Sequence, residues 1–130
     1  MGLKTVVLGI RSLLPEHRNA GAQLIFPEEI RSGIWKKKLT KVLRNVYVSI
    51  DVDVLDLGIL PAATNPEPGG LSWAEFSMVL STLLHGRTFL AGDIVELCPP
   101  AGPAYASVTA ARVLTRLIAL AEKRRSRSRG

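Results

Sequence analysis

The stretch VYVSIDVDVLD, residues Val46 to Asp56, decides the fold, because a run of Val and Ile ends in three carboxylates, Asp51, Asp53 and Asp56. Short β-branched runs of this kind are typical of buried strands. Successive side chains of a strand alternate between its faces, so Asp51 and Asp53 are expected to point the same way. Two unpaired carboxylates so placed repel each other and are costly to bury. A cation is therefore expected between them.

Strands and helices alternate along the rest of the chain. We predict strands over residues 5–10, 22–26, 47–53 and 87–97, and helices over residues 27–43, 73–85 and 107–125. This alternation indicates parallel β-α units. The predicted fold class is α/β, a three-layer α/β/α arrangement with a mainly parallel sheet covered on both faces. One domain spans residues 1–122.

Two of the predicted helices have clear local signals. The helix over 27–43 starts with Pro in its first turn and carries Lys toward its end, and Ile30, Ile34 and Leu39 are expected to face inward. The helix after Ser72 has a capping box, in which Ser72 and Glu75 bond each other's main-chain N–H groups. Pro-rich loops are predicted over residues 57–70 and 98–106.

Composition limits the class of protein. A hydrophobic content of 47% and a mean hydropathy of +0.21 argue against disorder. No apolar run approaches the roughly 18 residues of a membrane span, and the first residues do not resemble a secretory signal. The single cysteine, Cys98, cannot form an internal disulfide. A soluble cytoplasmic protein is expected, with no membrane partner.

The net charge of +6 comes almost entirely from residues 123–130, which contribute five of the positive charges. We interpret this segment as a disordered, solvated basic tail. An arm that binds nucleic acid is the alternative, but the tail lacks interleaved aromatic residues and the rest of the chain is nearly neutral. Nucleic acid is therefore not an expected partner.

The available ligand types limit the cation. The chain has only His17 and His85, far apart, and no cysteine cluster, so a structural zinc site is not expected. Oxygen ligands such as Asp51 and Asp53 suit Mg²⁺ or Mn²⁺. The alternative is that one acid caps a loop and the other pairs with Lys or Arg. For the histidines, local structural roles are expected.

A second pair of acids, Asp93 and Glu96, lies near the end of the strand predicted over 87–97. Ligands of open α/β sheets bind beyond the carboxyl ends of the strands, where these acids are expected. Glu96 could hold a planar guanidinium through paired hydrogen bonds. A surface salt bridge is the alternative for this residue.

Three segments, SIDVDVLD, PAATNPEPGGLSWAE and GDIVELCPP, follow one another between residues 46 and 100. Together they resemble the ureohydrolases, the family of arginase, agmatinase and formimidoylglutamase, as do VVLGIRS near the start and the final apolar helix. The resemblance implies a three-layer α/β fold. It also implies two Mn²⁺ ions that activate a bridging hydroxide, which attacks a guanidinium carbon and releases urea or a related amide.

The resemblance assigns a role to five residues of this chain. Asp51 and Asp53 match the metal-ligand aspartates, with Asp51 expected to bridge both ions. Glu96 matches the glutamate that binds the guanidinium, and Asn65 stands in the substrate loop where Thr is frequent. Asp93 matches an acid beside the site, for which only a supporting role is expected.

Several positions depart from the family pattern. Leu57 replaces a usual Pro, AATN replaces a run similar to Gly-Thr-Gly-Thr, and Cys98 stands where Asn is common. Ser12 and Leu14 occupy the places where arginases carry the acids that hold the substrate's α-amino group. The resemblance therefore favours a decarboxylated amine such as agmatine over arginine.

The largest departure is an absence. The Gly-Gly-Asp-His and His-x-Asp-Ala-His segments that supply the other metal ligands in the family do not occur in the 130 residues. The chain resembles the C-terminal half of a ureohydrolase. We expect an agmatinase-like polypeptide that hydrolyses a guanidino compound to urea and an amine. It is expected to be active only if another chain provides the other half of the site, and to occur as a homo-oligomer or with a second chain. The alternative is a non-catalytic interaction or scaffold protein, or a truncated product, that retains the fold.

Overall fold

The computed structural model of the chain describes residues 4–13, 15, 21–39 and 44–127, with side chains as far as Glu122. In chain order its elements are β1 (Val6–Leu8), β2 (Gln23–Ile25), α1 (Pro27–Ser32), α2 (Trp35–Lys38), β3 (Asn45–Asp51), the 3-10 turn η3 (Val52–Val54), α3 (Trp73–Leu84), β4 (Thr88–Val95), the 3-10 turn η4 (Pro99–Ala101) and α4 (Ala104–Arg127). From β2 onward strands alternate with helices, which confirms the predicted α/β class.

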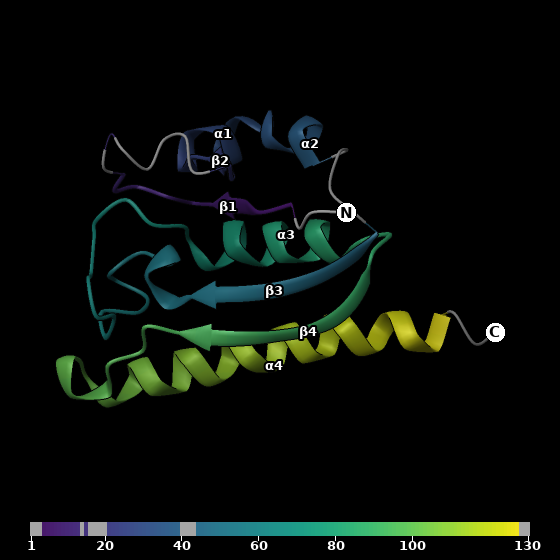
Figure 1. Cartoon of the computed structure of the whole chain (residues 1–130). Coiled ribbons are helices and arrows are strands. Elements are labelled where there is room, and N and C mark those ends of the chain that lie inside the picture. The colour runs from purple at the N-terminus through teal and green to yellow at the C-terminus, as the bar shows by residue number, and fades with distance from the viewer. Residues whose placement is uncertain (1–3, 14, 16–20, 40–43, 128–130) are drawn as a thin grey trace.

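The strands form two parallel pairs. β1 pairs with β2, and β3 pairs with β4 in a register that runs from Asn45 opposite Thr88 to Asp51 opposite Val95. In Figure 1 the arrowheads of β3 and β4 point the same way, so the carboxyl ends of both strands lie at one edge of the structure. Of the predicted site residues, Asp53, Asn65 and Glu96 lie beyond these ends, Asp51 is the last residue of β3, and Asp93 lies within β4.

The core lies between the strands and the helices that follow them. Its buried side chains include Ile50, Val52, Phe76, Leu80, Leu84, Val113 and Leu117. α3 packs against α4, and α4 runs along β4 (Figure 1). Gly92 allows close approach on this face, because a Cβ there would lie 2.4 Å from the Val48 carbonyl oxygen of β3 and 3.3 Å from Leu117 of α4. α4 therefore covers the face of β4 on which Gly92 lies.

The opposite face of the β3–β4 pair is exposed within the described residues. Tyr47, Ser49 and Asp93 are exposed on it, and Val95 is 37% exposed. The sequence predicted helices on both faces of the sheet. In the described part of the chain, helices cover only one face of the β3–β4 pair. An exposed sheet face with large side chains marks a surface that another polypeptide can cover.

The helix predicted over residues 27–43 is broken. Gly33 has a left-handed φ of 78° and ends α1, after which α2 begins in a new phase. As a result Trp35 is fully buried and Ile34 is 55% exposed, so the inward orientation expected of Ile34 is wrong. Ile30 and Leu39 are buried as predicted. The end of the predicted helix, residues 40–43, lies outside the described residues.

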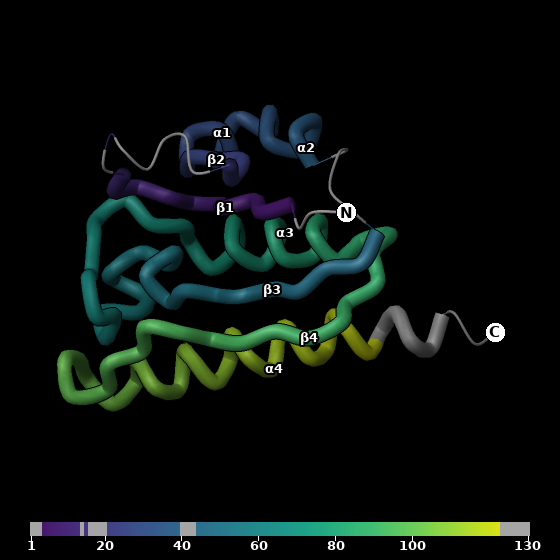
Figure 2. Tube along the Cα trace, in the orientation of Figure 1, coloured from purple at the N-terminus to yellow at the C-terminus, as the bar shows by residue number. Residues whose placement is uncertain are grey.

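The helix after Ser72 forms as predicted. Ser72 Oγ accepts a hydrogen bond from the Glu75 amide at 3.2 Å, and a Glu75 carboxylate oxygen accepts one from the Ser72 amide at 2.8 Å. Figure 2 traces the loop that leads from η3 to this helix. Apart from isolated bridges, this loop has no regular secondary structure. The capping box thus fixes the far end of the loop that carries Asn65.

α4 differs from the predicted final helix in three ways. It begins at Ala104, three residues before the predicted start, and continues to Arg127, so residue 122 is not a break in the helix. The segment Ala104–Glu122 has a mean hydropathy of 1.3 and is long and apolar enough to cross a membrane, which sequence reasoning missed. Its buried residues, Ala106, Ala110, Val113 and Leu117, pack into the core.

Candidate functional site

Asp51 and Asp53 are joined by a tight turn. Asp51 is the last residue of β3, and Asp53 lies in η3, where its amide donates a 3.1 Å hydrogen bond to Asp51 Oδ1. Asp side chains commonly accept such a bond from the amide two residues ahead. The sequence predicted that Asp51 and Asp53 point the same way because they alternate along one strand. This reason is wrong, because β3 ends at Asp51 and Asp53 lies in η3. The turn nevertheless places the two acids beside each other.

The electrostatics of Asp53 reflect this proximity. Its pKa is raised above the ordinary value, first by burial and then by the negative charge of Asp51. The positive charge of Arg11 acts in the opposite direction. The two carboxylates therefore repel each other, which is the condition that a bound cation would relieve.

Arg11, Ser12 and Glu67 surround this turn, and sequence reasoning gave them no role at the acids. A guanidinium nitrogen of Arg11, Nη2, donates to the main-chain carbonyl of Asp53. The Glu67 carboxylate lies 3.9 Å from Arg11 Nε and accepts a hydrogen bond from the Ser12 hydroxyl. One sequence feature could have indicated a role for Arg11. It directly follows the strand predicted over residues 5–10, at the carboxyl edge of the sheet where Asp51 and Asp53 are expected. Leu14, the other position at which arginases carry an acid, lies outside the described residues.

Asn65 and Glu96, the predicted substrate-binding residues, lie on two segments that the fold joins. The carbonyl of Glu96 accepts hydrogen bonds from the Thr64 amide at 3.0 Å and from the Thr64 hydroxyl at 3.1 Å. Ala63 and Leu97 form an antiparallel bridge beside them. The loop of Asn65 is therefore held against the end of β4, and the side chains of Asn65 and Glu96 are both exposed.

Glu96 also has an unusual backbone. Its φ is 62°, the only positive φ of a residue other than glycine among the described residues. Such a conformation costs on the order of 1–3 kcal/mol and is concentrated at functional positions. No ion pair of Glu96 is found within the described part of the chain, so the alternative of a surface salt bridge is not seen.

Asp93 lies within β4, opposite Ser49 and on the exposed face of the strand pair. Its pKa is lowered by a hydrogen bond from Ser49 and by one from the Tyr47 hydroxyl, which donates to Oδ2 at 2.6 Å. The carboxylate of Asp93 raises the pKa of Tyr47 in turn. Asp93 is thus fixed by neighbouring strand residues, on the same face as Asp51.

The oxygen donors of Asp51 and Asp53 are of a type that binds manganese, but two carboxylates are too few to hold the ion. Asp51 and Asp53 are hard oxygen donors of the type that Mn²⁺ accepts. Across the described ranges, no group of three or more His, Cys, Asp or Glu side chains is placed to hold a metal ion. His85 is exposed at the C-cap of α3, in agreement with a local structural role, and His17 lies outside the described residues. The described residues alone do not complete a metal centre.

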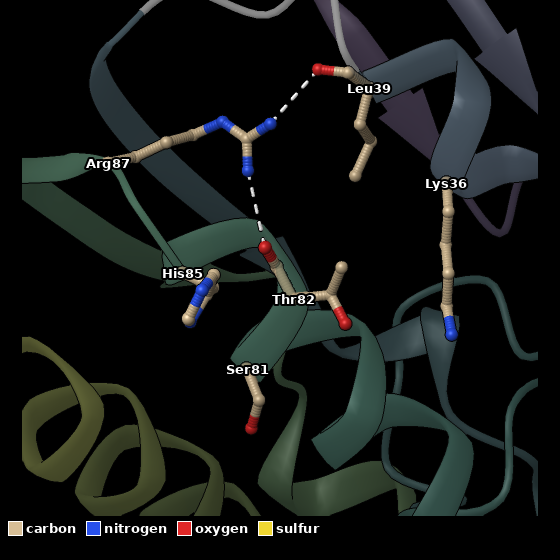
Figure 3. Close-up of a pocket in the computed structure, with 6 residues that line it drawn as sticks. All are labelled: Lys36, Leu39, Ser81, Thr82, His85 and Arg87. Carbon is tan, nitrogen blue, oxygen red and sulfur yellow. Dashed lines mark hydrogen bonds between the residues drawn. The ribbon is translucent and has the colours of Figure 1, made fainter.

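A hollow of about 480 Å³ lies elsewhere, near the end of α3 and the start of β4. Figure 3 shows its lining residues: Lys36, Leu39, Ser81, Thr82, His85 and Arg87. The Arg87 guanidinium donates to the carbonyls of Leu39 and Thr82 at 2.9 and 3.2 Å. This hollow is at the amino ends of the strands, away from Asp51, and its arginine is occupied by main-chain carbonyls.

Comparison with known proteins is consistent with these observations. The Arginase family model matches residues 2–120. The chain is 30% identical over 127 residues to the agmatinase of Pyrococcus horikoshii, covering 95% of this chain and 45% of that protein. It is 32% identical over 125 residues to the N(1)-aminopropylagmatine ureohydrolase of Thermus thermophilus, covering 92% and 42%.

Solved structures show the same fold. The agmatine ureohydrolase of Thermoplasma volcanium superposes with a TM-score of 0.80 at 26% identity, covering 95% of this chain and 44% of that one. The Helicobacter pylori arginase gives a TM-score of 0.76 at 22% identity, covering 89% and 43%. The chain thus spans less than half the length of these relatives.

Proposed function

Because the chain belongs to the arginase family, we propose that it is an agmatinase-like ureohydrolase polypeptide, which contributes Asp51, Asp53 and Glu96 to a composite site. One observation carries the proposal: two acids in a tight turn at the end of β3 lie at the same sheet edge as an exposed, conformationally strained glutamate at the end of β4. The reaction would hydrolyse a guanidino compound to urea and an amine.

Each residue has a separate role in this proposal. Asp51 and Asp53 would hold Mn²⁺, with two ions in the completed site, and the relief of their mutual repulsion would favour the ions. A manganese pair, when bound, would supply the water activation that guanidinium hydrolysis needs. Glu96 would bind the guanidinium, with Asn65 beside it in the substrate loop and Asp93 in a supporting position.

An amine without a carboxylate is the favoured substrate class. Ser12 stands where arginases carry an acid, and its hydroxyl is engaged by Glu67. Relatives with similar coverage of this chain carry the names agmatinase and N(1)-aminopropylagmatine ureohydrolase. We therefore propose agmatine, or an agmatine derivative, in preference to arginine.

A polypeptide that supplies the rest of the fold is the proposed partner. The chain spans less than half the length of these relatives, and the described residues lack a third metal ligand. The exposed face of β3 and β4 offers a surface for such a partner. A homo-oligomer or a second chain could cover it, and we propose that the assembly works in the cytoplasm without nucleic acid or a membrane.

A non-catalytic interaction or scaffold protein is the second candidate, favoured by the absence of a third ligand within the described ranges. The two functions are separated by combining the chain with a polypeptide that contains the amino-terminal part of an agmatinase. Mn²⁺-dependent urea release from agmatine by the mixture, and by neither part alone, supports the enzyme. A stable complex that never releases urea supports the scaffold.

A further inference from the structure

We propose that Arg11 is a positioning residue that holds the turn of Asp51 and Asp53 against the end of β1, and that Glu67 neutralises Arg11. This inference rests on the proposed function, because it concerns the same acids. No role of this kind follows from the order of the residues in the sequence, since Arg11 is 42 residues from Asp53 and Glu67 is 55 residues from Ser12.

One guanidinium joins two parts of the main chain. Arg11 Nη1 donates to the Gly9 carbonyl at 3.2 Å, and Nη2 donates to the Asp53 carbonyl at 2.5 Å. Its side chain is only 11% exposed. β1 and β3 belong to separate sheets. The planar guanidinium, with its fixed directions of donation, therefore links the two sheets where the acids lie.

Packing supports the same contact. A Cβ at Gly9 would lie 2.7 Å from a Val54 methyl group, so the end of β1 approaches the turn as closely as a glycine permits. On its other side the turn is bonded to Leu71, whose amide donates to the Val54 carbonyl at 2.8 Å. The turn is thus held from two sides, and Arg11 provides the polar contact on the side of β1.

Arg11 contacts the backbone of Asp53 and forms its ion pair with a different acid, Glu67. Arg11 bonds the carbonyl of Asp53 and forms its ion pair with Glu67, at 3.9 Å from Nε. Glu67 is itself held by the Ser12 hydroxyl. A buried arginine needs a counter-charge, and Glu67 provides it. The carboxylate of Asp53 is therefore left for a cation while its backbone is fixed.

The contact is tested by hydrogen exchange, measured by mass spectrometry on peptides that cover residues 50–56, in the form in which the full chain is isolated. Arg11→Met removes both carbonyl bonds, and Arg87→Met is the matched control, since Arg87 also bonds main-chain carbonyls but far from the acids. We expect roughly tenfold faster exchange in this turn for Arg11→Met, as for loss of a hydrogen bond from a charged group. Arg87→Met should leave it unchanged.

Arg11→Lys separates charge from geometry. It keeps the positive charge but lacks the two-armed guanidinium, so its turn should still exchange faster than in the parent chain. Full recovery of protection by Lys would overturn the positioning role and leave only an effect of charge. Unchanged exchange in Arg11→Met, or equal acceleration in Arg87→Met, would overturn the proposal as well.

A second measurement connects the turn to the metal. In the completed enzyme, Mn²⁺ affinity followed by electron paramagnetic resonance should fall by about 10- to 100-fold in Arg11→Met, the usual effect of losing a group that orients a ligand. If Arg11→Met exchanges faster in residues 50–56 but binds Mn²⁺ with the affinity of the parent enzyme, the inference is contradicted. If the parent assembly binds no Mn²⁺, the proposed function fails, while the exchange experiment still decides whether Arg11 holds the turn.

Discussion

The amide of Asp53 donates a 3.1 Å hydrogen bond to Oδ1 of Asp51, so the two acids form a single local structure. Burial, and then the charge of Asp51, raise the pKa of Asp53 above its ordinary value. A carboxylate pair that is pre-formed in this way is suited to bind a hard cation, because the backbone and not the ion sets the turn.

Asp51→Asn and Asp53→Asn should each abolish Mn²⁺-dependent activity of the completed enzyme. Asn keeps the side-chain oxygen that the turn uses but removes the ligand charge, so the fold should persist. The loss should exceed about 100-fold, since removal of a group that merely orients a ligand already costs 10- to 100-fold. Urea release and bound manganese are the measurements.

Asp56→Asn is the matched control for these variants. Asp56 belongs to the same segment, but its Oδ1 accepts a hydrogen bond from the Gly58 amide at 3.0 Å and it is given no metal role. Most of the activity should remain in this variant. Full activity in Asp51→Asn or Asp53→Asn would remove that residue from the metal site.

Glu96→Gln should impair substrate binding or turnover while manganese content stays near normal. The variant keeps the shape of the side chain but loses the charge that would hold a guanidinium through paired hydrogen bonds. The ratio kcat/KM for agmatine and the metal content of the same sample are the measurements. Loss of bound metal would show that Glu96 is a ligand of the ions.

The capping box of α3 should make stability depend on acid pH. Hydrogen bonds from the Ser72 backbone and side chain and the nearby Arg31 lower the pKa of Glu75 below its ordinary value. This stabilisation is therefore present above the unfolded pKa and is lost as pH falls through the folded pKa. Chemical denaturation across pH 3 to 6 should show it, at about 1 kcal/mol.

Glu75→Gln is the control for this pH dependence. Its amide oxygen can still accept the bond from the Ser72 amide, but it does not titrate, so the slope of stability against pH should become smaller. An unchanged slope would mean that other groups cause the acid sensitivity.

Gly70→Ala should destabilise the loop that leads from the acids to α3. A Cβ at Gly70 would lie 2.4 Å from the carbonyl carbon and oxygen of Leu55, which are backbone atoms and cannot move aside freely. Overpacking of this kind costs about 1–3 kcal/mol. Gly58→Ala is the control, since its nearest neighbour would be Asp56 Oδ1 at 3.4 Å. Equal stability of both variants, measured by thermal unfolding, would contradict this packing.

Local sequence patterns predicted most of the secondary structure. Short apolar runs identified the four strands that the described residues form, and Ser72 and Glu75 identified the start of α3. Errors occurred where one residue changes the phase of an element. Gly33 ends a helix that its composition would continue, so Trp35 replaces Ile34 in the core.

The positions of the acids relative to the strands were predictable, and their surroundings were not. Asp51 ends β3, Asp53 lies in the next turn and Glu96 follows β4, while the metal and substrate roles that the family resemblance implies for them stay predictions. The contacts of Arg11 and Glu67 link segments far apart in the sequence, and no periodicity encodes such pairs. The turn at Asp53 was missed for a local reason: a strand pattern continues through Val52 and Val54, but the backbone leaves the strand at Asp51.

The central claim is that this chain supplies one part of a composite ureohydrolase site. It is tested most directly by measuring Mn²⁺-stimulated urea release from agmatine together with mass in solution, for the chain alone and with the amino-terminal part of an agmatinase. The account predicts negligible release and self-association or aggregation for the chain alone, and Mn²⁺-dependent release from the mixture. A monomer that hydrolyses agmatine by itself would contradict the claim.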